Sequence, residues 1–294
     1  MTKEKIKLTN GLVIPAIGFG TYNPDCKEED EQVAIIRQAI ECGYRYFDTA
    51  SRYGTERALG RAIRESGIDR SEFIVATKVW IDEMGQEETR NAFFRSMERA
   101  DIGYFDYYLI HWPRRAENDT DWKARDLETY RAMEQLVRQG YISGIGLSNF
   151  LPHHLDSILC ECEIRPVMDQ LEMHPGYLQT TANSYCRKND ILVQAWSPLG
   201  RGRVLAHPYI MRRAEKYQKT PAQVCLRFLI QKGIMPIVKA SSRERMLQNL
   251  EVFDFTLNDE EMSIIGCMPQ TGWSGEHPDF AIPKAKSHSG ELSQ

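Results

Sequence analysis

The sequence predicts an α/β protein folded as a (β/α)8 TIM barrel with a β-hairpin at its amino terminus. Short continuous apolar runs alternate with amphipathic stretches, which is typical of buried parallel strands joined by helices. The length of 294 residues is near the roughly 250 residues typical of this barrel. Many runs end in a residue suited to catalysis or ring stacking, and such a barrel gathers its strand ends on one face. One shared site is therefore expected there, and the run-ending residues are Asp48, Lys78, His111, Ser148, Asn149, Gln170, Trp196 and Lys239.

The elements are expected to follow one another in a regular order along a single domain, residues 1–294. Residues 5–15 are predicted to form a hairpin that turns at Asn10-Gly11, because both residue types tolerate positive φ. After the hairpin, strand–helix units alternate without a linker or a low-complexity tract. The eight units are expected to begin near residues 17, 44, 73, 106, 142, 166, 191 and 234.

Glycines mark the ends of several predicted helices. The helices over about 28–42, 123–139 and 220–232 are followed by Gly43, Gly140 and Gly233. Glycine after the last turn adopts the left-handed conformation that ends a helix at little cost. The third helix also has a start signal, since Thr220-Pro221-Ala-Gln223 offers an N-cap, a proline at the first helical position and a capping partner.

Composition excludes several classes of function. The net charge of −4 argues against a nucleic-acid partner, which would require a basic face. No apolar stretch approaches the ~20 residues of a membrane span, and the first residues lack the apolar stretch of a signal peptide. The seven cysteines are scattered, and the one tight pair, Cys160 and Cys162, has no second pair to complete a zinc site. We therefore expect reduced thiols, a cytoplasmic protein and no metal.

Three motifs carry a resemblance to a known family. Residues 43–60 (GYRYFDTASRYGTERALG), 144–150 (GIGLSNF) and 237–249 (IVKASSRERMLQN) resemble the three signatures of the aldo-keto reductase superfamily. Their order and spacing match over about residues 5–282, and the segment 272–279 resembles bacterial members. The chain is similar in particular to bacterial aldehyde and ketone reductases, among them the diketogluconate reductases.

The resemblance implies a catalytic tetrad of Asp48, Tyr53, Lys78 and His111, because all four residue types stand at the matching positions. Reduction of a carbonyl by hydride leaves an oxygen that needs a proton as its negative charge develops. Tyr53 would donate that proton, and the ammonium of Lys78 would lower the tyrosine pKa from its ordinary value of about 10. Asp48 would pair with Lys78, and His111 would orient the substrate carbonyl or assist the proton relay.

Each of these four residues also fits a plainer role when it is taken alone. Tyr53 fits a surface aromatic, Asp48 a helix cap, Lys78 a solvated strand end and His111 a hydrogen-bonded core histidine. All four occur in the order of the family and are expected at one face of the barrel, which favours catalysis over the plainer roles.

The same resemblance implies a nicotinamide dinucleotide bound across the barrel mouth. The chain has no Gly-x-Gly-x-x-Gly motif after a strand, so a Rossmann domain is not indicated. Ser148, Asn149 and Gln170 match the residues that bind the carboxamide. Trp196 stands where the family more often has tyrosine and is expected to stack on the nicotinamide, with core packing as its plainer role. The expected cofactor-binding residues are Gly20, Thr21, Tyr22, Asp48, Ser148, Asn149, Gln170, Trp196, Ser197, Leu199, Lys239, Ser241, Ser242, Arg245, Gln248 and Asn249.

Lys239, Ser242 and Arg245 match the positions that hold the adenosine 2′-phosphate, which favours NADPH over NADH. Barrels often bind phosphate at a helix amino terminus after the last strands, and residues 241–244 have the form of a capping box that would begin such a helix. A charged, solvated helix start is the plainer alternative.

Two departures from the family pattern lie in the same segment. Ala240 replaces the usual serine or threonine, which removes one hydroxyl contact. Gln248 stands where many members carry glutamate, beside Asn249, which matches the adenine contact. Neither departure points to another cofactor.

The expected substrate is a small carbonyl compound. The segments 114–122 and 200–208 are short, which suggests an open pocket that accepts small aldehydes, dicarbonyls such as methylglyoxal, and keto sugars. The residues that match substrate-pocket positions are Tyr22, Tyr53, Trp80, His111 and Trp112.

The sequence thus predicts NADPH-dependent reduction of aldehydes and ketones to alcohols by a monomer. One alternative is a nucleotide-binding regulatory subunit built on the same barrel, which would keep Asn149, Lys239 and Arg245 without turnover. Another is a metal-dependent barrel hydrolase. Its strand ends should carry His-x-His or clustered carboxylates, which this chain lacks there.

Overall fold

Eight parallel strands form a closed barrel in the computed structural model, which describes residues 4–280. Their order around the barrel is β10-β3-β4-β5-β6-β7-β8-β9. Each strand begins one or two residues after its expected position, so the predicted fold class is confirmed. The strands are β3 (Gly18–Gly20), β4 (Tyr46–Asp48), β5 (Ile74–Val79), β6 (Tyr107–Ile110), β7 (Gly144–Ser148), β8 (Met168–Glu172), β9 (Leu192–Trp196) and β10 (Met235–Val238).

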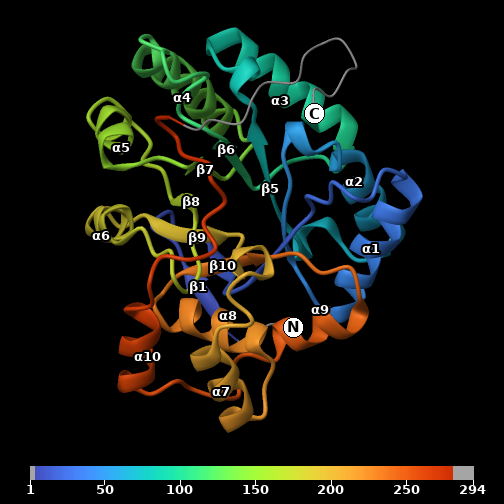
Figure 1. The fold of residues 1–294 in the computed structure, drawn as a ribbon. Coiled ribbons are helices and arrows are strands. Elements are labelled where there is room, and N and C mark those ends of the chain that lie inside the picture. The colour runs from blue at the N-terminus through green and yellow to red at the C-terminus, as the bar shows by residue number, and fades with distance from the viewer. Residues whose placement is uncertain (1–3, 281–294) are drawn as a thin grey trace.

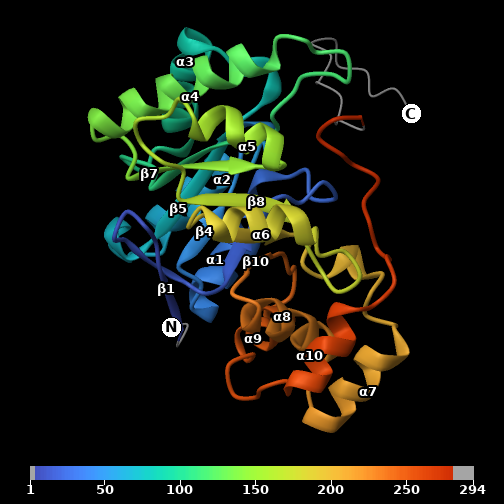
Figure 2. The ribbon, with the colours of Figure 1, turned by 90° about the vertical axis from the view of Figure 1, so that its left-hand side faces the viewer.

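A two-stranded hairpin covers the amino-terminal end of the barrel. It consists of β1 (Lys5–Lys7) and β2 (Val13–Pro15), which pair antiparallel as predicted. Of the two turn residues, only Gly11 has a positive φ, at 84°. Leu8 and Ile14 are buried in one cluster with side chains from inside the barrel. In the side view of Figure 2, the hairpin and the red carboxyl-terminal segment lie at opposite ends of the barrel.

Helices surround the barrel on its outside (Figure 1). Short 3-10 helices interrupt the loops, and of these η1 (Ser51–Tyr53) and η3 (Ile81–Glu83) lie near the predicted site. The helices that follow the strands are α1 (Glu29–Cys42), α2 (Glu56–Glu65), α3 (Gln86–Ala100), α4 (Trp122–Arg138), α5 (Pro152–Leu159), α6 (Thr180–Lys188), α7 (Pro208–Tyr217), α8 (Pro221–Gln231), α9 (Arg243–Leu250) and α10 (Asp259–Gly266).

The predicted helix boundaries agree with the structure to within one residue. Gly43, directly after α1, has a φ of 106°, and Gly140 and Gly233 after α4 and α8 also have positive φ. Thr220 caps α8, since its Oγ1 accepts from the backbone N–H of Gln223 at 3.2 Å. The Gln223 side chain accepts from the Thr220 N–H at 2.8 Å, which completes the predicted capping box.

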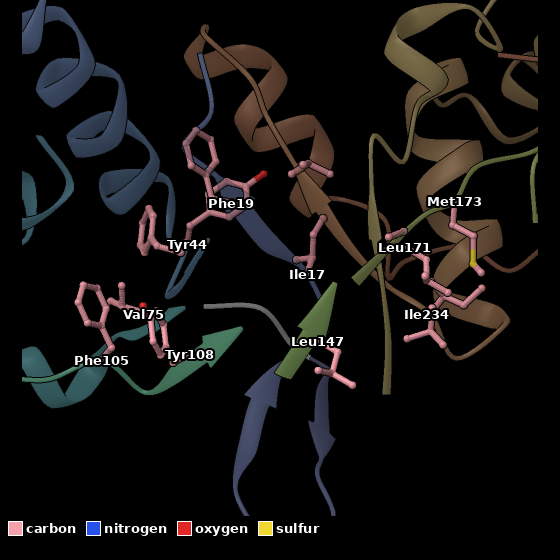
Figure 3. Close-up of a cluster of buried hydrophobic side chains, with 14 of the residues drawn as sticks. Ile17, Phe19, Tyr44, Val75, Phe105, Tyr108, Leu147, Leu171, Met173 and Ile234 are labelled. Atoms are coloured by element: carbon pink, nitrogen blue, oxygen red, sulfur yellow. The ribbon is translucent and has the colours of Figure 1, made fainter. Parts of the chain in front are cut away.

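The main hydrophobic core lies between the strands and the surrounding helices. Figure 3 shows part of it, with Phe19, Val75 and Leu147 from the strands and Tyr44 and Phe105 from the segments that lead into them. Burial of such large side chains is the main favourable contribution to folding.

One glycine of the first motif is explained by a close helix–helix contact. A Cβ atom placed on Gly60 in α2 would lie 1.6 Å from the backbone oxygen of Ala100 at the end of α3. No side chain fits there, so glycine lets these two helices approach each other. The first motif therefore contains a packing requirement at Gly60 as well as the predicted catalytic residues Asp48 and Tyr53.

Other sequence expectations concern the chain as a whole. All seven cysteines are free thiols, as predicted. Among residues 4–280, no helix has the length and apolar character needed to cross a membrane. The predicted domain of residues 1–294 includes residues 1–3 and 281–294, which lie outside the described residues.

Asp169 on β8 is a buried carboxyl group that should make stability depend on pH. Its side chain points away from the barrel interior and contacts the Cys186 thiol, with Sγ 3.8 Å from Oδ2. Burial raises the pKa of Asp169 from 3.8 to about 8. Between these two pH values the folded state keeps a proton that the unfolded state has lost. The free energy of unfolding should therefore fall as pH rises from about 4 to about 8, by at most on the order of 5 kcal/mol.

We expect Asp169→Asn to flatten this pH dependence and to raise stability at pH 8 relative to the wild type. Urea unfolding between pH 5 and pH 8.5 measures the free energy of unfolding of each variant. Asp190→Asn, at an exposed position, is the matched control. Parallel pH profiles for the wild type and Asp169→Asn would contradict the assignment.

Candidate active site

The four predicted catalytic residues meet at the carboxyl-terminal face of the barrel. Asp48 ends β4, Lys78 lies near the end of β5, and His111 directly follows β6. Tyr53 ends η1, the short helix that follows β4. Lys78 has no exposed side-chain surface, which excludes the plainer role of a solvated strand end.

Short contacts connect these residues into one chain. The Lys78 Nζ donates to Asp48 Oδ2 at 2.6 Å, to the backbone oxygen of Thr49 at 3.0 Å and to the Tyr53 hydroxyl at 3.3 Å. The Tyr53 hydroxyl lies 3.4 Å from His111 Nε2. Because Lys78 donates to the Tyr53 oxygen, the Tyr53 O–H can point toward His111 or toward a substrate oxygen.

Burial dominates the protonation of the tyrosine in this structure. Burial first, and then the negative charge of Asp48, raise the pKa of Tyr53 well above 10. The expectation that Lys78 sets a lowered pKa is wrong for this state, because loss of solvation outweighs the attraction of the ammonium. Tyr53 therefore holds its proton at neutral pH, as a proton donor must before it reacts.

Burial also shifts the pKa of two other ionisable groups in the cluster, Lys78 and His111. Burial lowers the pKa of Lys78, and the charge of Asp48 opposes that shift. Burial, followed by the positive charges of Lys78 and Arg52, lowers the pKa of His111 well below 6.5. The imidazole is therefore neutral at pH 7, a point that the sequence left open.

A series of hydrogen-bonded polar side chains inside the barrel holds the Asp48 carboxylate in place. This series was not predicted from the sequence. Gln170 Nε2 donates to Asp48 Oδ1 at 2.9 Å and to Gln194 Oε1 at 3.2 Å. Gln194 Nε2 in turn donates to the Tyr46 hydroxyl at 2.8 Å. Side chains along a strand point alternately to its two faces, and this pattern could have revealed the series. Tyr46 lies two residues before Asp48, and Gln194 lies two residues before Trp196, so each shares the inward face of its partner.

The residues expected to bind the nicotinamide carboxamide lie together and bond to one another. Asn149 Nδ2 donates to the His111 backbone oxygen and to Ser148 Oγ, while Ser148 Oγ donates to the backbone oxygen of Gln170. Trp196 Nε1 donates to Asn149 Oδ1 at 2.8 Å. The indole N–H thus fixes the Asn149 amide, a contact that a tyrosine at this position would make differently.

Two small cavities are lined by five of the predicted cofactor residues. Asn149 and Trp196 line one cavity, together with Glu172, Tyr177 and Glu276. The other is lined by Gly20, Thr21, Lys239 and side chains of α1. Ser197 and Leu199 lie in the loop that follows β9, where Ser197 has a positive φ of 48°.

The predicted phosphate-binding segment begins a helix, although one residue later than expected. Ser242, not Ser241, caps α9, and its Oγ accepts from the backbone N–H of Arg245 at 3.5 Å. The capping box predicted for residues 241–244 is therefore wrong, because Glu244 instead accepts from Gln248 Nε2 at 3.1 Å. Lys239 and Arg245 are both exposed beside this helix start, and Asn249 is buried.

The three aromatic pocket residues differ in their exposure. Tyr22 is 53% exposed and packs against Tyr53, with ring centroids 4.9 Å apart. Trp80 is buried and meets the His111 ring edge to face at 4.9 Å. Trp112 is buried within the main hydrophobic core. Of the three, Tyr22 therefore forms the open rim, and Trp80 forms the wall beside His111.

One cluster in the described part of the chain has the side chains of a metal site. His153, His154 and Asp279 place three ligand atoms within 4.8 Å of one another. Two observations disfavour a cation there. The guanidinium of Arg114 lies 3.3 Å from the same Asp279 oxygen. His154 Nδ1 accepts from the Leu151 N–H, so the proton of the neutral ring is on Nε2, which faces Asp279. The contacts of Asp279 with His153 and His154 instead hold the segment around Asp279 against α5.

The tyrosine, the lysine–aspartate pair and the neutral histidine lie together at the carboxyl-terminal face of a (β/α)8 barrel, the arrangement that the sequence predicted for an oxidoreductase acting on carbonyl or alcohol groups. A sequence model of the Aldo/keto reductase family matches residues 16–267. The chain therefore belongs to the aldo/keto reductase family.

Individual relatives agree with this assignment. The chain is 39% identical over 281 residues to 9,11-endoperoxide prostaglandin H2 reductase of Trypanosoma cruzi (strain CL Brener), covering 95% of this chain and 96% of that protein. It is 38% identical over 277 residues to glyoxal reductase of Bacillus subtilis (strain 168), covering 94% and 97%. A crystal structure of a Bombyx mori aldo-keto reductase in complex with NADP superimposes with a TM-score of 0.86 at 30% identity, covering 96% and 99%.

Proposed function

We propose that this enzyme reduces small aldehydes, dicarbonyls and keto sugars to alcohols with NADPH, and that Tyr53 donates the proton. The observation that carries the proposal is the position of the Tyr53 hydroxyl, 3.3 Å from Lys78 Nζ and 3.4 Å from His111 Nε2. A carbonyl oxygen between Tyr53 and His111 would meet a proton donor on one side and an imidazole on the other.

The residues of the chain fit a dinucleotide with a 2′-phosphate. Lys239 and Arg245 place two exposed cations at the start of α9, where backbone N–H groups also favour an anion. Gly20 and Thr21 share a cavity with Lys239 and would line the path of the cofactor. The Bombyx mori relative, solved in complex with NADP, supports the same choice.

When bound, the dinucleotide supplies the hydride. As negative charge develops on the carbonyl oxygen, Tyr53 gives it a proton, and Lys78 stabilises the tyrosinate that remains. Asp48 holds the Lys78 ammonium in place, and the polar chain through Gln170 holds Asp48. Neutral His111 orients the carbonyl without adding a charge of its own.

We further propose that the chain is one domain that acts as a cytoplasmic monomer. The residues proposed for catalysis all come from a single chain, so no second copy is needed to complete the site. Seven free thiols fit a reducing compartment.

NADPH oxidation in the presence of glyoxal, methylglyoxal and a keto sugar tests the proposed function. We expect turnover with at least the dicarbonyls, since a glyoxal reductase is among the relatives, and we expect no effect of a chelator. Tight NADPH binding without turnover would instead support a regulatory subunit. Loss of activity with the chelator would support a metal-dependent enzyme.

We predict that NADPH binds more tightly than NADH. We also predict that Arg245→Ala reduces this difference in affinity by weakening NADPH binding selectively. Loss of a charged hydrogen bond to the 2′-phosphate should cost ~1.5–3 kcal/mol, whereas NADH has no phosphate at that position. Quenching of tryptophan fluorescence during titration with each cofactor measures both affinities. Arg243→Ala, at the same exposed helix start, is the control. Equal weakening of both cofactors by Arg245→Ala, or the same NADPH-selective loss in Arg243→Ala, would contradict the contact.

A further inference from the structure

Gln194 is a polar side chain buried inside the barrel, below the residues expected to bind the nicotinamide. It lies on β9, two residues before Trp196, and has no exposed surface. Its Oε1 accepts from Gln170 Nε2 at 3.2 Å, and its Nε2 donates to the Tyr46 hydroxyl at 2.8 Å and to the Met235 sulfur at 3.4 Å. A buried amide costs free energy unless its polar atoms are bonded. Because these contacts occupy both ends of the Gln194 amide, they hold it in one orientation.

The Asp48 carboxylate sets the direction of this series of hydrogen bonds. A carboxylate only accepts hydrogen bonds, so the Gln170 atom that lies 2.9 Å from Asp48 Oδ1 must be the amide nitrogen. The second N–H of that nitrogen reaches Gln194, whose facing atom must then be its oxygen. The Gln194 nitrogen donates to Tyr46, and the Tyr46 hydroxyl donates to the Met168 sulfur at 3.6 Å. Both N–H groups of the Gln170 amide are therefore committed inside the barrel.

The side-chain oxygen of Gln170, Oε1, is the atom that this arrangement leaves for a ligand. It accepts no hydrogen bond within residues 4–280, and it is not fully buried. The neighbouring donors are already used, because Asn149 Nδ2 and Ser148 Oγ bond to each other and to backbone oxygens. The place expected for the carboxamide of the cofactor therefore offers an acceptor, which suits the NH2 group of that carboxamide.

We propose that Gln194 is a positioning residue, which holds the Gln170 amide so that its Oε1 receives the NH2 group of the nicotinamide carboxamide. Two hydrogen bonds from one nitrogen fix the plane of an amide, whereas a single bond lets the amide rotate about that bond. Without Gln194, the second N–H of Gln170 is a buried donor without a partner, and a rotation that satisfies it would move Oε1.

This inference rests on the proposed function, in which Gln170 helps to bind the nicotinamide. It adds a residue that is buried too deeply to touch the cofactor or the substrate, and that acts through Gln170. Such support from behind fixes the geometry of a binding residue before the ligand arrives.

The binding of two oxidised cofactors tests the inference without relying on turnover. These are NADP+ and its 3-acetylpyridine analogue, which carries a methyl group in place of the carboxamide NH2. In Gln194→Leu, the affinity for NADP+ should fall by ~3- to 10-fold, the loss expected for one neutral hydrogen bond. The affinity for the analogue, which lacks that donor, should change by less than about twofold. Quenching of tryptophan fluorescence during titration measures both affinities in wild type and variant.

Two further variants test the role of orientation. Gln194→Glu is the conservative change, since a buried glutamic acid is expected to keep its proton. Its carbonyl would then accept from Gln170 while its O–H donates to Tyr46, so at pH 6 this variant should restore the affinity for NADP+. Tyr46→Phe removes the acceptor of Gln194 and should give a smaller loss with the same selectivity against NADP+.

Tyr107→Phe is the matched control for Tyr46→Phe. Tyr107 is buried in the same inner cluster of the barrel, but its hydroxyl takes no part in the series of hydrogen bonds. The variant should bind both cofactors like the wild type. Urea unfolding of each protein without cofactor checks that the variants are folded before titration.

Equal weakening of both cofactors in Gln194→Leu, or no weakening of either, would overturn the inference. A loss of NADP+ affinity in Tyr107→Phe as large as that in Gln194→Leu would also overturn it. The proposed function fails in a different way, by the absence of carbonyl reduction in the wild type. The two affinities would then still be measured, and they alone decide whether Gln194 positions Gln170.

Discussion

Tyr53→Phe is expected to lower kcat by ~10²–10⁴-fold, the loss typical of a missing general acid, and to leave NADPH affinity unchanged. The phenylalanine ring keeps the packing against Tyr22 at 4.9 Å, so the structure of the pocket should persist. What disappears is the hydroxyl that lies between Lys78 Nζ and His111 Nε2. Steady-state kinetics with a small aldehyde at saturating NADPH measures the effect.

Tyr22→Phe is the matched control, because it removes a hydroxyl from the neighbouring ring, which is 53% exposed. We expect that variant to retain most of its kcat. A kcat for Tyr53→Phe near that of the wild type, or an equal loss in Tyr22→Phe, would mean that another group donates the proton.

The strand positions could be predicted from the sequence because each strand is a short apolar run with a clear end. All eight strands begin within two residues of their expected positions, although β3 has only three residues, Gly18–Gly20. The residues that end these runs are directed to one face by the parallel arrangement alone. For this reason Asp48, Lys78 and His111 could be placed at one site before any distance was known.

Details that depend on neighbouring atoms were harder to predict. The start of α9 was expected at Ser241, but Ser242 is the cap, because two adjacent serines fit the capping pattern equally well. The direction of the Tyr53 pKa shift was missed, since sequence shows the charge of Lys78 but not the burial that outweighs it. The support of Asp48 by Gln170 and Gln194 requires knowledge of which strands are adjacent.

The contact between Trp196 and Asn149 illustrates a further limit. The resemblance placed Trp196 at a ring-stacking position where the family more often has tyrosine. From the sequence, this difference suggested only that the polar group is an N–H in place of a hydroxyl. The structure shows that the indole N–H donates to Asn149 Oδ1 at 2.8 Å. Local patterns assign residues to elements, whereas a hydrogen bond between residues 47 positions apart is decided by packing.

Lys78→Met is expected to abolish most carbonyl reduction at neutral pH. The ammonium donates to Tyr53 and Asp48, and without it the phenolate that forms at Tyr53 has no positive charge to stabilise it. Single-turnover reduction at saturating NADPH measures the chemical step, and circular dichroism checks folding. Lys188→Met, at an exposed position on α6, is the control and should react like the wild type.

Because Lys78 is completely buried, its removal also leaves the Asp48 carboxylate without its partner, which should cost about 3–5 kcal/mol of stability. The double variant Asp48→Asn with Lys78→Met replaces the ion pair by neutral groups of similar size and should recover much of that loss. It should remain inactive, since Tyr53 still lacks the ammonium. A folded Lys78→Met or double variant that reduced aldehydes at the wild-type rate would show that Lys78 does not assist the proton transfer, although the family assignment would stand.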